Sequence, residues 1–197
     1  MAFFTKAEVR KAAQQAIGAN RSARDVLSDA RKTYKEKDRF DIFLSHSFAD
    51  AELVLGVKVL LEAQGLRVYV DWVDDKALER DQVTEKTADV LRKRMRQSES
   101  LLYLASDNAS KSKWMPWELG YFDGFKNGGV SILPVLEKSD SPFEGQEYLG
   151  LYPIITKEKL TQSNVKQTST RVIRPRSGTP FDPGFPTFPL GGPRIYL

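Results

Sequence analysis

The sequence predicts an α/β domain in which a five-stranded parallel sheet carries helices on both faces. From Phe40 onward, short apolar runs alternate with segments whose apolar residues recur at helical spacing. The apolar runs are nearly continuous, which is typical of strands that are buried on both faces. Strands that alternate with helices pair in parallel through right-handed crossovers. These observations predict one sheet in the middle layer of the domain.

Residues 1–37 are predicted to form a helical extension ahead of this domain. Alanine and aliphatic residues recur at helical spacing over residues 5–17, and Gly-Ala-Asn at 18–20 interrupts them. Residues 22–25 have the pattern of a capping box and start a second helix. The apolar stripe of this helical hairpin is narrow and rich in alanine, which predicts that it docks on a larger surface.

Residues 38–160 contain the strands and helices of the domain itself. Asp50 is placed to cap the helix after the first strand, and Gly65 to end it. The predicted strands cover residues 40–44, 66–70, 101–105 and 130–136, with 149–155 as the fifth; further helices are predicted over 83–97 and 117–125, and a charged loop over 71–81.

Residues 161–197 are predicted to form an extended tail rich in proline and glycine. Six of the ten prolines lie between Pro175 and Pro193, and aromatic residues lie among and after them. Proline at this density opposes helices and central strands. Two interpretations stay open: the tail packs on the domain or a neighbouring subunit, or it is disordered.

The composition limits the possible classes of function. The chain has 197 residues, of which 41% are apolar and 28% are charged, and it has no cysteine. The lack of cysteine excludes a disulfide framework, thiolate catalysis and cysteine-ligated zinc, and it fits a reducing compartment. No apolar run approaches the roughly 20 residues that span a bilayer, and the N-terminus does not resemble a signal peptide. We therefore expect a cytoplasmic protein with no membrane partner.

The net charge of +4 is concentrated near the N-terminus, because residues 1–39 carry +5 and the remainder carries −1. A basic helical segment can bind nucleic acid or anionic lipid. In this segment, however, acidic residues are interleaved with the basic ones, as on a solvated helix face. We do not expect nucleic acid as a partner.

Several catalytic motifs are absent. The chain has no glycine-rich dinucleotide fingerprint and no phosphate loop that ends in Gly-Lys-Ser/Thr. His46 is the only histidine, so a histidine metal site and a chain of acid–base histidines are not expected. No bound cofactor is expected either. Ser45 and His46 are adjacent, a spacing at which the two side chains rarely face each other as a Ser–His–Asp hydrolase requires. Open parallel sheets bind ligands beyond the carboxyl ends of their strands, which singles out the loops that start at Ser45, Asp71 and Ser106.

Two segments resemble Toll/interleukin-1 receptor (TIR) domains. Residues 40–47, FDIFLSHS, resemble the first conserved box of that family. Residues 106–119 resemble the segment in which a serine, a tryptophan and a Glu-Leu pair open a helix. Within it, Trp114 and Glu118 match the Trp-x-x-x-Glu motif of TIR enzymes that consume NAD. The similarity runs over about residues 38–155 and is greatest to bacterial TIR proteins, many of which serve in anti-phage defence.

This resemblance implies an enzyme that cleaves the nicotinamide–ribose bond of NAD, with NAD as substrate and with nicotinamide and ADP-ribose or a cyclic ADP-ribose isomer as products. It also implies TIR–TIR self-association and a separate sensor or effector protein. By resemblance, Glu118 is the catalytic residue, the loop after the first strand forms a wall of the site, and Asp71 and Trp72 begin a variable loop that often mediates self-association. The candidate substrate-binding residues are Ser45, His46, Phe48, Asp71, Trp72, Arg80 and Trp114.

Physical reasoning supports Glu118 independently. Proline favours the first helical position, so Pro116 predicts that a helix begins there and that Glu118 lies in its first turn, where the helix dipole keeps a carboxylate ionised. Breaking the nicotinamide–ribose bond builds positive charge on the sugar. Because nicotinamide leaves as a neutral molecule, one fixed carboxylate can suffice. A purely structural role is also open, in which Glu118 only complements the helix end, worth roughly 0.3–1 kcal/mol.

Two further functions are compatible with the same sequence. A TIR scaffold without activity would signal by self-association alone, and a nucleotide-binding module would bind NAD without turnover. Trp114 is expected either to wall the site or to pack in the core. Phe48 is expected either to stack on a ring of the substrate or to pack in the core, and Arg80 either to pair with a phosphate or to be solvated.

Overall fold

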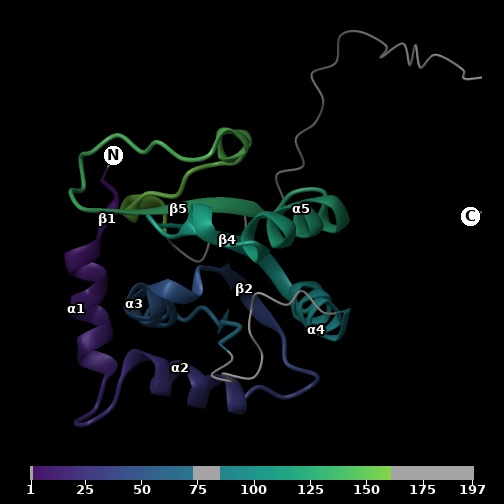
Figure 1. The fold of residues 1–197 in the computed structure, drawn as a ribbon, viewed down its shortest axis with the longest axis horizontal. Coiled ribbons are helices and arrows are strands. Elements are labelled where there is room, and N and C mark those ends of the chain that lie inside the picture. The colour runs from purple at the N-terminus through teal and green to yellow at the C-terminus, as the bar shows by residue number, and fades with distance from the viewer. Residues whose placement is uncertain (1, 73–84, 161–197) are drawn as a thin grey trace, which may run out of the picture.

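The computed structural model describes residues 2–72 and 85–160 (Figure 1). The strands are β1 (Phe4–Thr5), β2 (Phe40–Ser45), β3 (Val68–Tyr69), β4 (Ser98–Ala105) and β5 (Val130–Leu136). The helices are α1 (Lys6–Ala16), α2 (Ala23–Lys32), α3 (Ala51–Glu62), α4 (Glu85–Arg96) and α5 (Trp114–Lys126). Within these two ranges, no helix has both the length and the apolar character needed to cross a bilayer.

The five strands form one parallel sheet in the order β1-β5-β4-β2-β3. This confirms the predicted fold class. Among β2 to β5 the order is that of flavodoxin-like sheets, in which the chain direction along the sheet reverses next to the first strand of the domain. The reversal lies between β2 and β4, so these two strands end where a ligand is expected to bind.

The fifth strand comes from the N-terminus, and the prediction that residues 149–155 supply it is wrong. Phe4 and Thr5 pair with the last two residues of β5. Residues Glu147–Leu151 instead form a 3-10 helix, and Ile154 makes only an isolated bridge to Ile132. Pro153 has no N–H to donate to a ladder, which opposes a longer strand at this position.

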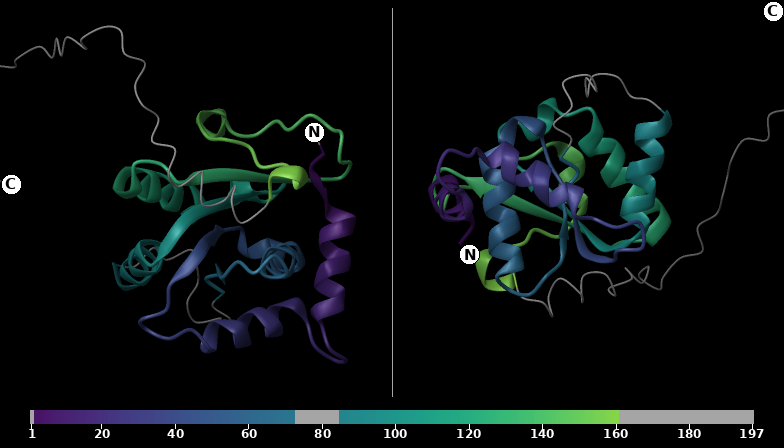
Figure 2. Two further views of the ribbon diagram at one scale, coloured as in Figure 1. Left: turned by 180° about the vertical axis from the view of Figure 1, so that it is seen from behind. Right: turned by 90° about the horizontal axis from the view of Figure 1, so that it is seen from below.

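Helices cover both faces of the sheet (Figures 1 and 2). One face packs against α1, α2 and α3 through aliphatic residues such as Val9, Leu27 and Leu61. The other packs against α4 and α5 through larger residues such as Tyr103 and Phe122. The predicted α/β layering is therefore present, with two separate apolar cores.

Helix α1 lies directly against α3, and a glycine makes this contact possible. A Cβ atom at Gly56 would lie 2.0 Å from the carbonyl oxygen of Val9. Val9 and Ala13 are fully buried at this contact. The N-terminal segment therefore adds both a strand to the sheet and a helix to one of the cores.

Helix α2 and the residues that directly follow it lie beside β3, the edge strand of the sheet. The Tyr34 hydroxyl donates to the Val68 carbonyl over 3.1 Å, and Arg31 Nε lies 3.3 Å from Asp71 Oδ1. Covering an edge strand in this way prevents it from pairing with another chain.

Candidate active site

Buried polar side chains collect at the carboxyl ends of β2 and β3 and on α5. Ser45, Asp50, Asp71 and Glu118 are each no more than 7% exposed. Burial of a polar group costs free energy unless it is hydrogen-bonded, and burial of a charge costs more. Such a concentration at the ligand-binding edge of a parallel sheet marks this region as the candidate site.

The central contact of this site joins Ser45 to Glu118. Ser45 is the last residue of β2, and its hydroxyl donates to Glu118 Oε2 over 2.6 Å. Hydrogen bonds to a carboxylate are short and strong, and they favour its ionised form. The candidate site therefore contains a buried carboxylate that a serine hydroxyl holds in place. Its role in stabilising a cation stays a prediction.

The start of α5 differs from the prediction. The helix begins at Trp114, so Pro116 is its third residue and Glu118 its fifth. Proline is tolerated there because the first N–H groups of a helix have no partner within the helix. The expected place of Glu118 in the first turn is thus wrong. Because the dipole effect falls off within that turn, the hydrogen bond from Ser45 holds the carboxylate instead.

Trp114 lies one turn before Glu118 and is only 7% exposed. Its ring meets Trp117 edge-on, with centroids 5.3 Å apart, and it belongs to the apolar core beneath α5. Trp114 therefore packs in the core. Its role as a wall of the substrate site stays a prediction.

His46, Phe48 and Trp72 form a stack that joins the loops after β2 and β3. The Trp72 ring lies 5.6 Å from His46 and 4.7 Å from Phe48, with small angles between the planes. His46 Nδ1 lies 2.8 Å from the Leu44 carbonyl oxygen. Trp72 is fully buried and packs against the rings of His46 and Phe48. Contact of these three residues with substrate stays a prediction.

Asp71 is held by residues at the β3 edge of the sheet. The Tyr69 hydroxyl donates to its carboxylate over 3.0 Å, and Arg31 pairs with the same oxygen. Burial, reinforced by the charge of Asp71, raises the pKa of Tyr69 well above its ordinary value. A substrate contact by Asp71 stays a prediction, and Arg80 lies outside the described residues.

The sequence analysis missed Tyr103 and the two polar residues linked to it, Gln146 and Tyr148. Tyr103 of β4 pairs in register with Ser45, and its hydroxyl donates to Gln146 Oε1 over 3.1 Å. The Tyr148 hydroxyl donates to the same oxygen over 3.0 Å. Burial, Tyr148 and the negative charge of Glu118 all raise the pKa of Tyr103. In sequence, Tyr103 lies within an apolar run and resembles a core residue; only its register with Ser45 could have singled it out.

Arg24 of α2 was also missed, because it lies in the N-terminal extension. Its guanidinium carbon is 4.9 Å from the centre of the Phe48 ring, and the residue is exposed. No carboxylate within residues 2–72 and 85–160 pairs with it, whereas Arg31 on the same helix pairs with Asp71. An exposed arginine at this edge, without an acidic partner in those two ranges, is suited to bind an anion.

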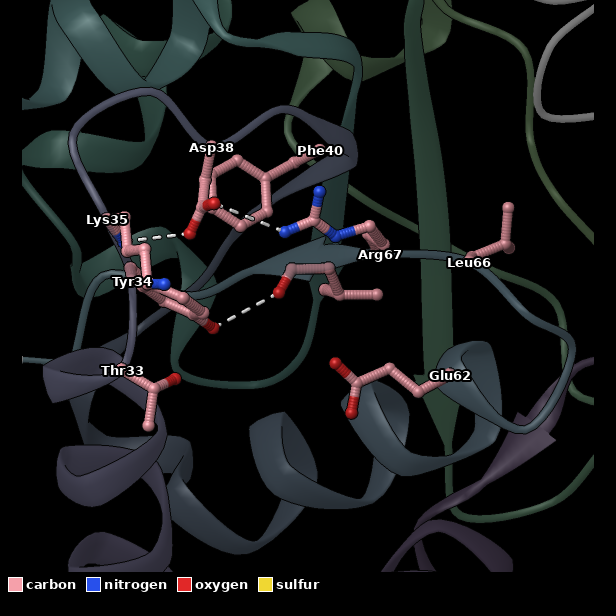
Figure 3. Close-up of a pocket in the computed structure, with 9 residues that line it drawn as sticks. Thr33, Tyr34, Lys35, Asp38, Phe40, Glu62, Leu66 and Arg67 are labelled. Atoms are coloured by element: carbon pink, nitrogen blue, oxygen red, sulfur yellow. Dashed lines mark hydrogen bonds and ion pairs between the residues drawn. The ribbon is translucent and has the colours of Figure 1, made fainter.

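A separate pocket of about 360 Å³ lies at the opposite, amino end of the sheet (Figure 3). Its lining residues include Tyr34, Asp38, Phe40, Glu62 and Arg67. Arg67 pairs with Asp38 at 3.6 Å, and Glu62 pairs with a lysine of α3. Elsewhere in the described part of the chain, no three acidic or histidine side chains are grouped as metal ligands.

Comparisons with known proteins point to one family. A profile described as TIR domain matches residues 42–163. A Bacillus cereus protein named "Probable 3' cyclic ADP-D-ribose synthase ThsB'" is 49% identical over 149 residues, which cover 75% of this chain and 77% of that protein. A Cytobacillus dafuensis protein named "Putative cyclic ADP-D-ribose synthase TIR2" is 33% identical over 88 residues, 44% of this chain and 23% of that protein.

Among solved structures, the TIR domain of the Toll-related receptor TRR-2 from Hydra magnipapillata is 19% identical with a TM-score of 0.41, covering 58% of this chain and 83% of that one. The profile match extends over more than half of the chain, and it includes Ser45, Trp114 and Glu118. The chain belongs to the TIR domain family.

Proposed function

We propose that this protein is an NAD-cleaving TIR enzyme that releases nicotinamide and converts the remaining ADP-ribosyl group into a cyclic ADP-ribose isomer. The observation that carries the proposal is the buried Glu118 carboxylate, held by Ser45 at the carboxyl edge of the sheet. The relative that is 49% identical is named as a synthase of such a cyclic product.

The proposed reaction needs one negative charge in a fixed place. The bond between nicotinamide and ribose C1' breaks, and its electron pair leaves with neutral nicotinamide. The positive charge that develops on the ribose is stabilised by the Glu118 carboxylate, which does not have to reorganise because Ser45 already fixes it. A hydroxyl group of the same ADP-ribosyl unit then bonds to C1' and loses its proton, so that cyclisation yields nicotinamide, the cyclic product and one proton.

Water is the competing nucleophile in this scheme. If it attacks C1', the product is ADP-ribose rather than a cyclic isomer. The apolar surroundings of Glu118, which include Trp114 and Phe122 on the same helix, favour an internal nucleophile because they limit the access of water.

We assign the diphosphate of NAD to Arg24, in addition to the predicted Arg80. Arg24 offers its guanidinium beside the loop after β2, and a guanidinium binds phosphate oxygens in a bidentate manner. Replacing Arg24 with methionine keeps the apolar stem on Phe48 and removes the charge. We expect KM for NAD to rise roughly tenfold, as for one charge-assisted contact, with little change in kcat. An unchanged KM would contradict the assignment.

Membership of the family supports a proposal for the biological role. TIR domains commonly self-associate, and we propose that this enzyme acts in bacterial anti-phage signalling, with a separate protein that detects infection or binds the cyclic product. Contacts between copies would complete or stabilise the site, so activity should increase with protein concentration.

The test is nicotinamide release from NAD by the purified full-length chain, with chromatographic identification of every product. Wild type is compared with Glu118→Gln at dilute and at concentrated protein, and circular dichroism verifies that both are folded. We expect release by wild type and a loss of about 10²–10³-fold in the variant. Equal release by both would remove Glu118 from the mechanism. No release under any condition would favour a scaffold that signals by self-association alone.

A further inference from the structure

Lys6 occupies an unusual position for a lysine. It is the first residue of α1, directly after β1, and only 9% of its side chain is exposed. Lysine is almost never buried to this extent unless its charge is paired. Its ammonium group lies 2.6 Å from Asp107 Oδ2 and 2.7 Å from Glu137 Oε1.

The two partners of Lys6 belong to the loops at the carboxyl edge of the sheet. Asp107 lies two residues after β4 ends, and Glu137 directly follows β5. Both carboxylates are largely exposed, at 78% and 75% of their side chains. One buried ammonium therefore ties two separate loops to the N-terminal segment.

The loop after β4 is in turn tied to the loop after β2. Ser106 and Asn108, the neighbours of Asp107, both donate to the Asp50 carboxylate, Asn108 over 2.7 Å. Asp50 is 6% exposed. It was predicted to cap α3, but it makes no side-chain hydrogen bond to that helix. Its carboxylate instead locks the two loops side by side.

The contacts of Asp50 connect the loop after β4 to Glu118 through Ser45. Asp50 ends the short 3-10 helix Phe48–Asp50, which follows Ser45 by only a few residues. Ser45 donates the hydrogen bond that orients Glu118. A displacement of the loop after β4 would therefore move the residues that set the position of the carboxylate.

We propose that Lys6 is a positioning residue for the candidate active site, and that the N-terminal strand and helix belong to the catalytic unit. Lys6 lies outside residues 42–163, the part of the chain that matches the TIR profile. It fixes the loops after β4 and β5, and Asp50 transmits this order to the loop that carries Ser45. The effect on turnover rests on the proposed function, whereas the effect on loop order does not.

The test compares Lys6→Met and Lys6→Arg with a matched control, Lys157→Met. Lys157 also ties the N-terminal segment to the domain, since its ammonium lies 2.6 Å from Glu8 Oε1. The other side-chain hydrogen bonds of Glu8 go to Thr5, in the N-terminal segment itself. For each full-length variant, kcat and KM for NAD, the melting temperature, and amide hydrogen exchange of residues 45–50 and 105–109 are measured.

We expect Lys6→Met to lower kcat about tenfold, with KM less affected, because small displacements of catalytic groups are costly. Exchange of both loop segments should be faster than in wild type. Lys6→Arg should restore most of kcat, and Lys157→Met should leave kcat and loop exchange unchanged even if it melts at a lower temperature.

A second variant covers the case in which Lys6→Met fails to fold. Asp107→Asn changes only an exposed side chain, and it should also speed exchange in residues 45–50. If wild type releases no nicotinamide, the proposed function fails and the exchange data still test the positioning. Normal exchange in both loops of Lys6→Met and of Asp107→Asn, or a kcat loss no greater than in Lys157→Met, would overturn the inference.

Discussion

The amino and carboxyl ends of the sheet differ in whether their charged side chains are exposed or buried. The amino end has an open pocket of about 360 Å³ whose lysine, arginine and glutamate side chains are exposed (Figure 3). The carboxyl end holds Ser45, Asp50 and Glu118, all nearly completely buried and hydrogen-bonded to one another or to neighbouring loops. The charges of the amino end are thus solvated, whereas those of the carboxyl end are buried.

The contrast teaches where to look for function in such a domain. Solvated charges around a groove cost almost nothing to maintain, so they imply no selection for a task. Burial of a carboxylate costs free energy, so a buried carboxylate indicates a function that an apolar residue cannot perform. Variants that separate stability from activity at each end test whether function lies at the carboxyl end.

The largest effect is expected at Glu118. Glu118→Gln should abolish nearly all nicotinamide release yet melt at or above the wild-type temperature, because it removes a buried charge. Single stabilising substitutions commonly add about 0.5–2 kcal/mol, and calorimetry measures the change. Loss of both stability and activity would instead identify Glu118 as a structural residue.

A smaller effect is expected at Ser45. Ser45→Ala removes the hydrogen bond to Glu118, and such a bond to a charged group contributes about 1.5–3 kcal/mol. We expect nicotinamide release to fall roughly ten- to a hundredfold, with Ser45→Thr as a variant that keeps the hydroxyl. Activity equal to wild type in Ser45→Ala would show that the carboxylate is positioned by different contacts.

The opposite pattern is expected at the amino end. Tyr34→Phe removes the hydrogen bond to the Val68 carbonyl, which should cost about 1 kcal/mol of stability in urea unfolding. Nicotinamide release by the folded variant should stay within a factor of two of wild type, in the manner of surface changes remote from a site. A clear loss of kcat would show that this end contributes to catalysis.

The smallest effect concerns Glu8, a partly exposed carboxylate outside both ends. A hydrogen bond from Lys157 and another from the Thr5 backbone lower its pKa from 4.5 to about 2. A lowered pKa in the folded state adds stability above pH 4.5, which is lost as the pH falls toward 2.

In Glu8→Gln, therefore, the free energy of unfolding should fall less steeply over that pH range than in wild type. Because the side chain is 50% exposed, solvent weakens the effect and added salt should reduce it further. Identical acid unfolding curves for the two proteins would contradict the assignment.

Local patterns in the sequence predicted much of the fold. The strand over residues 130–136 was located to the residue, because Gly128 and Gly129 predict the end of a helix just before an apolar run. In the structure α5 ends at Lys126, and Asn127, Gly128 and Gly129 all have positive φ angles. Strand β1 gave no such signal, since two residues show no periodicity and pairing with β5 alone defines it. The fifth strand was therefore assigned to the wrong end of the domain.

Sequence motifs named single residues of the candidate site but not the contacts between them. Glu118 and Ser45 were both named, but they lie 73 residues apart, and only the fold shows that they are bonded. Lys6 was missed because a lysine in a mixed-charge helix has the pattern of a solvated residue. Its burial depends on Asp107 and Glu137, which local patterns cannot bring together.

Gly56 has a consequence for genetics. Any side chain at this position would collide with the backbone of α1 near Val9, so α1 would have to move away from α3 and carry Lys6 with it. A screen for chains that have lost activity should therefore recover substitutions of Gly56 beside those of Glu118. The two classes should differ in the amount of protein found in cells: Glu118 variants should accumulate as intact protein, whereas Gly56 variants should be depleted.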